Sequence, residues 1–138
     1  MMQALNRVSR FWYRPSLGLL LLRVTLGFIF IHHGWMKLQN VPGTMKFIGM
    51  IGLPEYMAYA IMFVEIVGGT LLVLGITVRA AAVATGIAML VALGLAVLPT
   101  RGVSGGEFEI LLAASSFALA LIGAGRLRLV HVFEHDKE

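Results

Sequence analysis

The chain contains several apolar runs close to the length of a membrane crossing. Residues 80–98 include no charged side chain, and the apolar residues elsewhere also fall in runs rather than alternating with polar ones. A helix needs about 20 mainly apolar residues to cross the hydrocarbon of a bilayer. Since 59% of the residues are hydrophobic and only 13% are charged, the composition agrees with lipid as the solvent. We therefore expect an all-α, membrane-embedded protein.

The apolar runs predict a bundle of four transmembrane helices, separated by turn-forming residues such as Pro42 and Gly43. The predicted spans are residues 17–38, 56–76, 80–98 and 108–122. A short interfacial helix is expected over residues 44–53 and a loop over residues 99–107. These spans form one transmembrane domain, residues 17–125, between an interfacial N-terminal segment, residues 1–16, and a polar tail, residues 126–138.

Basic residues predict the orientation of the bundle, because loops rich in Lys and Arg stay on the cytoplasmic side. In a four-span topology one side carries Arg7, Arg10, Arg14, Arg79, Arg126, Arg128 and Lys137, and the other carries Lys37, Lys46 and Arg101. Both termini are therefore expected in the cytoplasm, with the protein in a bacterial inner membrane. The net charge of +4 is explained by these helix-end anchors, so nucleic acid is not expected as a partner.

Two absences in the sequence limit the cofactors that the chain can hold. Cysteine is absent, which excludes disulfides, thiolate zinc sites and iron–sulfur ligation within this chain. His32 and His33 are adjacent on the first span and point about 100° apart, so they do not form a bis-histidine haem site. No metal site is expected, and His33 is interpreted either as an interfacial residue or as a donor to a quinone carbonyl.

Three charged residues in the apolar spans require an explanation, because a charge at the centre of a membrane helix costs about 2.5–3.5 kcal/mol. They are Arg23, Glu65 and Glu109. Arg23 shares a helical stripe with Gly27, Phe30, Gly34 and Lys37, and glycines allow a neighbouring backbone to approach closely. Glu65 lies on a face with Gly68, Gly69 and Leu72. We expect both charges to face protein rather than lipid.

The depths of these groups suggest two polar contacts. Arg23 and Glu65 are expected to interact directly or through one water molecule, and Glu109 is expected near Lys37 or a histidine at the outer face. The candidate intramembrane polar site is therefore Arg23, His33, Lys37, Glu65 and Glu109. These groups can either fix helix register alone or line one cavity for protons or a quinone. Lys37 can also reach the membrane surface with its long side chain.

The order and spacing of several motifs resemble those of the DoxX family of small bacterial membrane proteins. The resemblance rests on Arg23-x3-Gly27-x2-Phe30-x3-Gly34-x2-Lys37, on Leu53-Pro54, on Glu65-x2-Gly68-Gly69-x5-Gly75, on Thr77-x-Arg79, on Glu109 and on Gly123-x-Gly125-Arg126-Leu127. It covers roughly residues 20–129. The resemblance implies a four-helix membrane bundle associated with membrane redox systems, including quinone-linked sulfur oxidation.

Three functions are compatible with the sequence. The first is a membrane subunit of a redox system, with quinone as the candidate cofactor and a redox enzyme as the candidate partner. The second is a non-catalytic scaffold that holds a soluble oxidoreductase at the membrane. The third is a small-molecule or lipid transporter, which the absence of an internal repeat disfavours. The sequence contains no recognisable catalytic motif and leaves open whether the chain forms homo-oligomers.

Overall fold

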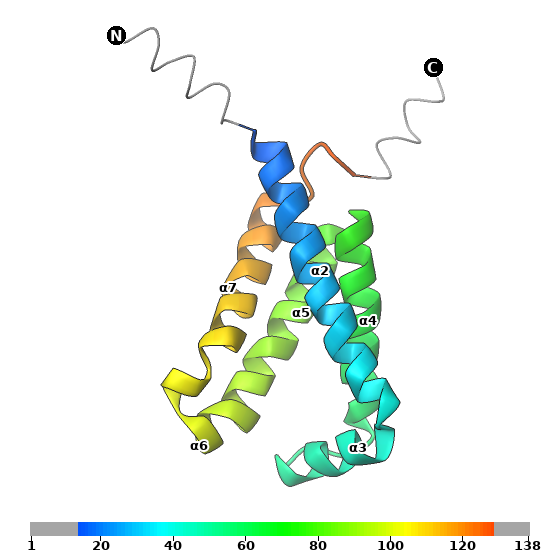
Figure 1. The fold of residues 1–138 in the computed structure, drawn as a ribbon, viewed down its shortest axis with the longest axis vertical. Helices are drawn as coiled ribbons and strands as arrows, with labels where there is room; N and C mark the ends of the chain where they lie inside the picture. The colour runs from blue at the N-terminus through cyan, green and yellow to red at the C-terminus, as the bar shows by residue number, and fades with distance from the viewer. Residues whose placement is uncertain (1–13, 129–138) are drawn as a thin grey trace, which may run out of the picture.

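A computed structural model of the chain describes residues 14–128, and this part consists of helices joined by turns (Figure 1). The predicted segments 1–16 and 126–138 lie mostly outside the described residues. The main helices are α2 (Pro15–Gln39), α3 (Val41–Met50), α4 (Met57–Leu74), α5 (Val78–Ala92) and α7 (Glu107–Ile122). Between α5 and α7 come a π-helical turn η1 (Leu93–Val97), α6 (Leu98–Arg101) and a 3₁₀ turn η2 (Val103–Gly105). No strand occurs in residues 14–128, in agreement with the predicted all-α class.

Helices α2 and α4 pack closely against each other through glycines. A Cβ atom added to Gly27 would lie 2.5 Å from the carbonyl oxygen of Gly69, and one added to Gly34 would lie 3.1 Å from the Cβ of Glu65. Contacts this short leave no room for a side chain, so the two backbones touch. The predicted glycine stripe is confirmed, because Gly27, Phe30 and Gly34 are all buried.

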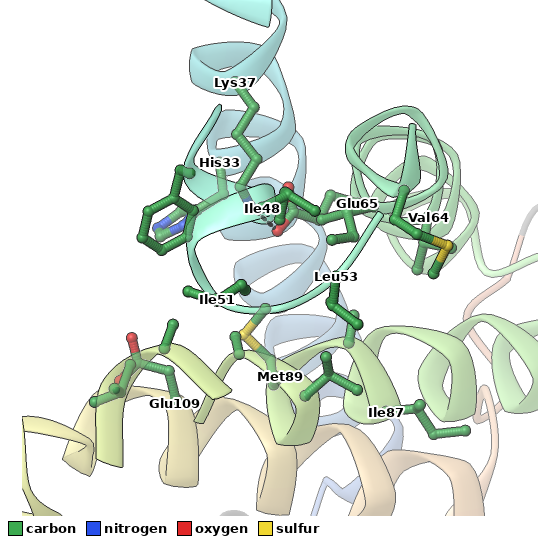
Figure 2. Close-up of a pocket in the computed structure, with 18 of the residues that line it drawn as sticks. His33, Lys37, Ile48, Ile51, Leu53, Val64, Glu65, Ile87, Met89 and Glu109 are labelled. Carbon is green, nitrogen blue, oxygen red and sulfur yellow. Dashed lines mark hydrogen bonds and ion pairs between the residues drawn. The ribbon is translucent and has the colours of Figure 1, made fainter. Parts of the chain in front are cut away.

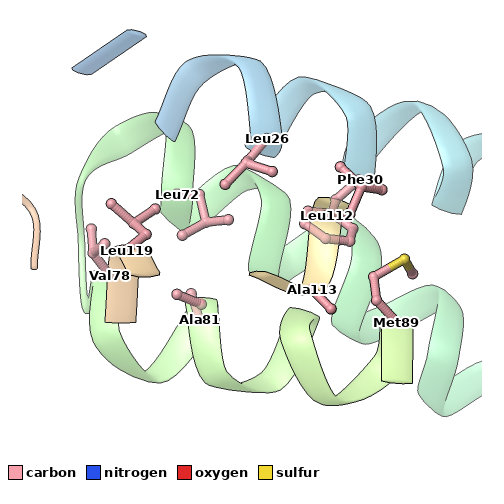
Figure 3. Packing of buried hydrophobic residues seen from close by; sticks show 10 residues of the cluster. Leu26, Phe30, Leu72, Val78, Ala81, Met89, Leu112, Ala113 and Leu119 are labelled. Atoms are coloured by element: carbon pink, nitrogen blue, oxygen red, sulfur yellow. The ribbon is translucent and has the colours of Figure 1, made fainter. Parts of the chain in front are cut away.

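Helix α5 contacts both α4 and α7 and so connects the two halves of the bundle. Small residues again allow the close approach: Gly86 of α5 lies against the ring of Phe117 in α7. The apolar core takes side chains from α2, α4, α5 and α7 (Figure 3). Its members include Leu26, Phe30, Leu72, Val78, Ala81, Met89, Leu112, Ala113 and Leu119.

Three helical segments of the described chain are long and apolar enough to cross a membrane: Pro15–Gln39, Met57–Leu74 and Val78–Arg101. The sequence predicted four spans, but the helix at the predicted fourth span, α7, is shorter than these three segments. Helix α7 has 16 residues. At a rise of 1.5 Å per residue it extends about 24 Å, less than the ~30 Å of bilayer hydrocarbon.

The third apolar segment continues further than predicted. A loop was expected from Pro99, but the helix continues through Pro99 to Arg101. Proline has no N–H, so the ordinary helical hydrogen bond is missing at this point. The backbone widens instead: the Leu98 N–H donates to the oxygen of Leu93, five residues earlier. The hydroxyl of Thr100 also donates to the carbonyl of Ala96, at 2.6 Å, which satisfies one of the disturbed carbonyls.

Helix α3 begins at Val41, three residues before the predicted start at residue 44. The predicted turn formers begin this helix instead of separating it from α2. Asn40 acts as its N-cap and accepts a hydrogen bond from the backbone N–H of Gly43, at 3.1 Å. Pro42 stands in the first turn, where its missing N–H has no cost. Helix α3 therefore follows α2 directly and lies across the end of the bundle (Figure 1).

A short turn joins the second and third apolar segments, two residues earlier than the gap predicted at residues 77–79. Gly75 ends α4 in the left-handed conformation, at a φ of 76°, and α5 begins at Val78. This turn, the start of α2 and the end of α7 lie at one end of the bundle, and α3 and α6 lie at the other (Figure 1). Among the described residues, Arg14, Arg79, Arg126 and Arg128 therefore lie at one end, and Lys37, Lys46 and Arg101 lie at the other.

Candidate functional site within the bundle

Glu65 lies at the centre of the α2–α4 contact and has no exposed surface. Its helix turns Met62, Glu65, Gly68 and Gly69 to the interior, so burial of this carboxyl follows from the apolar and small residues that share its face. Gly34 brings α2 within reach, and the Nζ of Lys37 bonds Oε1 of Glu65 (Figure 2). The Lys37 side chain is 29% exposed, so the pair joins a buried carboxylate to a half-buried ammonium group.

Arg23 is also buried, as predicted, but the predicted contact between Arg23 and Glu65 is wrong. In the antiparallel pair, Gly34 lies opposite Glu65, and Gly27 lies opposite Gly69 and Val73. Arg23 therefore reaches the other end of α4, where its guanidinium packs on Gly75. There Nη2 of Arg23 donates to the carbonyl oxygen of Leu127, so Arg23 links the start of α2 to the segment after α7.

A cavity of about 630 Å³ lies beside the Lys37–Glu65 pair. This volume is within the usual range for sites that bind small molecules, roughly 300–1,000 Å³. Its lining is mostly aliphatic and includes Ile51, Leu53 and Met89 (Figure 2). Four of the five residues predicted for the site line this one cavity: His33, Lys37, Glu65 and Glu109. Arg23 does not line it.

Glu109 and His33 form the outer part of the polar lining. The ring of His33 stacks on Phe108 of α7, with ring centroids 5.6 Å apart. This contact places α2 and the start of α7 on the same cavity. The sequence predicted that these two segments lie close together. Glu109 lines the same cavity as Lys37 and His33. Lys37 bonds Glu65 instead of Glu109, and Oε2 of Glu109 accepts no hydrogen bond.

Two carboxylate oxygens of the cavity are buried without a donor. They are Oε2 of Glu65 and Oε2 of Glu109. A buried acceptor without a donor costs about 1–3 kcal/mol, and more when it is charged. Both oxygens are thus suited to accept hydrogen bonds from a ligand or from water in the cavity. Within residues 14–128, no three His, Cys, Asp or Glu side chains gather as a metal site requires.

Sequence reasoning missed the part of the cavity that α3 supplies. Ile48 of this helix, with Ile51 and Leu53 after it, lines the end of the cavity that is far from the α4–α5 turn. Thr100 and Arg101 of α6 also line it, because the helix continues past Pro99. The apolar residues around Lys46 indicated an interfacial helix, but nothing in their pattern indicated that its apolar face would cover Glu65.

Comparisons with known proteins show which family the chain resembles. The family model for DoxX matches residues 18–98. A Bacillus subtilis (strain 168) protein named "Putative oxidoreductase CatD" is 40% identical over 114 residues, which cover 83% of this chain and 85% of that protein. The Escherichia coli (strain K12) "Inner membrane protein YqjF" is 29% identical over 70 residues, 51% of this chain and 54% of that protein. No solved structure gives a significant match.

Proposed function

The chain belongs to the DoxX family, and we propose that it is a membrane subunit of a redox system that binds a quinone-type ring beside Glu65. The observation that carries this proposal is that Glu65 belongs to the lining of a largely aliphatic cavity and that its buried Oε2 has no donor. A ring with oxygen substituents and an apolar body matches both parts of the lining. The name of the Bacillus subtilis relative is consistent with a redox role.

The polar groups of the cavity suit both forms of such a ring. A quinol presents O–H donors, and Oε2 of Glu65 and Oε2 of Glu109 are acceptors without donors. A quinone presents carbonyl acceptors, and Lys37 is a donor. His33 can donate or accept, according to its protonation state. We assign to Glu65 the contact with the ring, and to His33 and Glu109 the exchange of protons towards the outer face.

The scaffold function predicts a different interior. A protein that only holds a partner would close its charges into pairs and fill the space between them with apolar side chains. Here the Lys37–Glu65 pair borders a cavity of about 630 Å³. This favours ligand binding over a purely structural role for the site. A soluble oxidoreductase remains the proposed partner, because the chain has no catalytic motif of its own.

We also propose that α7 is the fourth span and that both termini are cytoplasmic, in the inner membrane of a bacterium. Helix α7 packs along α5, which is itself part of an apolar segment long enough to cross. The start of α7 lies near α6, which follows α5, and the end of α7 lies near the start of α5 (Figure 1). The Escherichia coli relative is named as an inner membrane protein.

Quinol binding to the purified protein and to Glu65→Gln tests the proposal. The tailed quinol menaquinol would be counted on the protein by native mass spectrometry in mild detergent. A hydrogen bond to a charged group contributes about 1.5–3 kcal/mol, so Glu65→Gln should bind roughly tenfold more weakly or worse. Glu107→Gln is the matched control, because Glu107 is exposed on α7 and does not line the cavity. Equal binding by wild type and Glu65→Gln would refute the assignment.

A further inference from the structure

Helices α4 and α5 touch at one end and separate towards the other. Near their connecting turn, Gly68 of α4 lies against Thr85 of α5, where an added Cβ would be 2.8 Å from the threonine methyl. Further from the turn the cavity lies between them, lined by Ile61 and Val64 of α4 and by Ala88 of α5. The cavity is therefore closed at the turn and continues outward from it.

The outer end of the cavity is covered by α3 and the residue that follows it, since Ile48 and Ile51 line it. The side between α4 and α5 is not covered in the same way. Ile87 and Val91 of α5 both line the cavity and remain 51% and 38% exposed. These side chains lie within a segment apolar enough to cross a membrane, so their exposed surface faces hydrocarbon. The cavity thus opens sideways into the bilayer between α4 and α5.

We propose that this opening is a lateral entrance and that it holds the hydrocarbon tail of a membrane quinol whose ring lies beside Glu65. The inference rests on the proposed function and adds the route by which the ligand enters and the place where its tail lies. Every residue that α5 contributes to the lining is apolar, whereas the charged residues of the lining come from α2, α4, α6 and α7. A molecule with a polar ring and an apolar tail matches this distribution.

The entrance follows from the residues of α5. Ala84, Ala88 and Ala92 are spaced four apart and all line the cavity, so their small side chains form one strip of the helix surface. Across the opening, Ala60 of α4 is also small. Larger residues in this strip would close the opening and leave Glu65 without access from the bilayer.

The test compares a tailed and a tail-less ring on variants of the opening. The probes are menaquinol and menadiol, which has the same ring type without an isoprenoid tail, with binding counted by native mass spectrometry. Ala88→Trp should weaken menaquinol binding about tenfold, equivalent to 1.4 kcal/mol, and leave menadiol binding unchanged. Retained menadiol binding shows that the variant is folded. Leu90→Trp is the control, since Leu90 is exposed on α5 and does not line the cavity.

The outcomes separate the entrance from the proposed function. Unchanged menaquinol binding by Ala88→Trp would overturn the proposed entrance. The proposal would also be overturned if Ala88→Trp and the smaller change Ala84→Phe each weakened menaquinol and menadiol binding equally. Glu65→Gln should weaken both probes. If Glu65→Gln binds both as wild type does, while Ala88→Trp still weakens menaquinol alone, the entrance stands and the contact with Glu65 is wrong.

Discussion

Lys37 makes the charge of Glu65 tolerable in the bundle. Glu65 is completely buried, and one of its oxygens bonds Lys37 while the other has no donor. A buried carboxylate that loses its cation is costly, whereas replacing both members of a pair by uncharged residues is often close to neutral. The stability of the bundle should therefore depend on whether the pair is broken or removed.

We predict that Lys37→Met destabilises the protein by about 1–3 kcal/mol, and that Lys37→Met with Glu65→Leu together costs less than Lys37→Met alone. The half-exposed position of Lys37 places the effect below that of a fully buried pair. The free energy of unfolding, from titration with sodium dodecyl sulfate, measures both. Strictly additive losses would show that the pair contributes no coupling.

Gly27 and Gly18 of the same helix should respond differently to an added methyl group. A Cβ at Gly27 would meet the backbone oxygen of Gly69 at 2.5 Å, whereas nothing lies within 4 Å of a Cβ at Gly18. Overpacking a close contact costs about 1–3 kcal/mol. Gly27→Ala should therefore destabilise the protein by this amount, and Gly18→Ala should leave it unchanged or slightly more stable. Similar unfolding curves for the two variants would contradict the α2–α4 contact.

The sequence was sufficient to predict which charged residues are buried, but not which ones meet. Arg23 and Glu65 stand within apolar spans, so their burial could be inferred from their neighbours. Their partners depend on how α2 slides along α4, and this register is fixed by backbone contacts at Gly27 and Gly34. A depth estimate from each helix end lacks this information and places Arg23 within reach of Glu65, whereas the residue opposite Glu65 is Gly34, 11 residues further along α2.

At the scale of elements, α7 depends on one face of small residues. Ala113 is buried against the rest of the bundle and Ala114, its neighbour, is exposed. We predict that Ala113→Leu destabilises the protein by about 1–3 kcal/mol and that Ala114→Leu has little effect. The same detergent titration compares them. A larger loss for Ala114→Leu would mean that α7 presents its other face to α5.

The ends of helices could be predicted where a glycine ends the helix. The predictions were wrong at prolines, because a proline can lie in a turn or inside a helix. The second span was predicted to end at residue 76, and Gly75 ends α4 close to that position. Pro42 was interpreted as part of a turn, but it lies in the first turn of α3. Pro99 lies within a helix because a π-helical turn accommodates it. Proline can begin, interrupt or kink a helix, and the surrounding packing decides between these outcomes.

For the whole molecule, the proposed four-span topology places the two ends of α7 on opposite sides of the membrane. Reporter fusions after Glu138 and within the loop at Gly105 should report the cytoplasm and the outer side, respectively. The result follows from the excess of basic residues at the end that holds Arg79 and Arg126. Both reporters on one side would show that α7 does not cross.

The central claim is that the cavity between α4 and α5 holds a quinone ring beside Glu65. The most direct measurement is photolabelling of the membrane-embedded protein with a menaquinone that carries a photoactivatable group on its ring, followed by peptide mapping. We expect label on residues that line the cavity, such as Val64 and Ala88, and loss of that label with excess unmodified menaquinone. Label spread over lipid-facing residues such as Leu90, or label that excess menaquinone does not displace, would contradict the account.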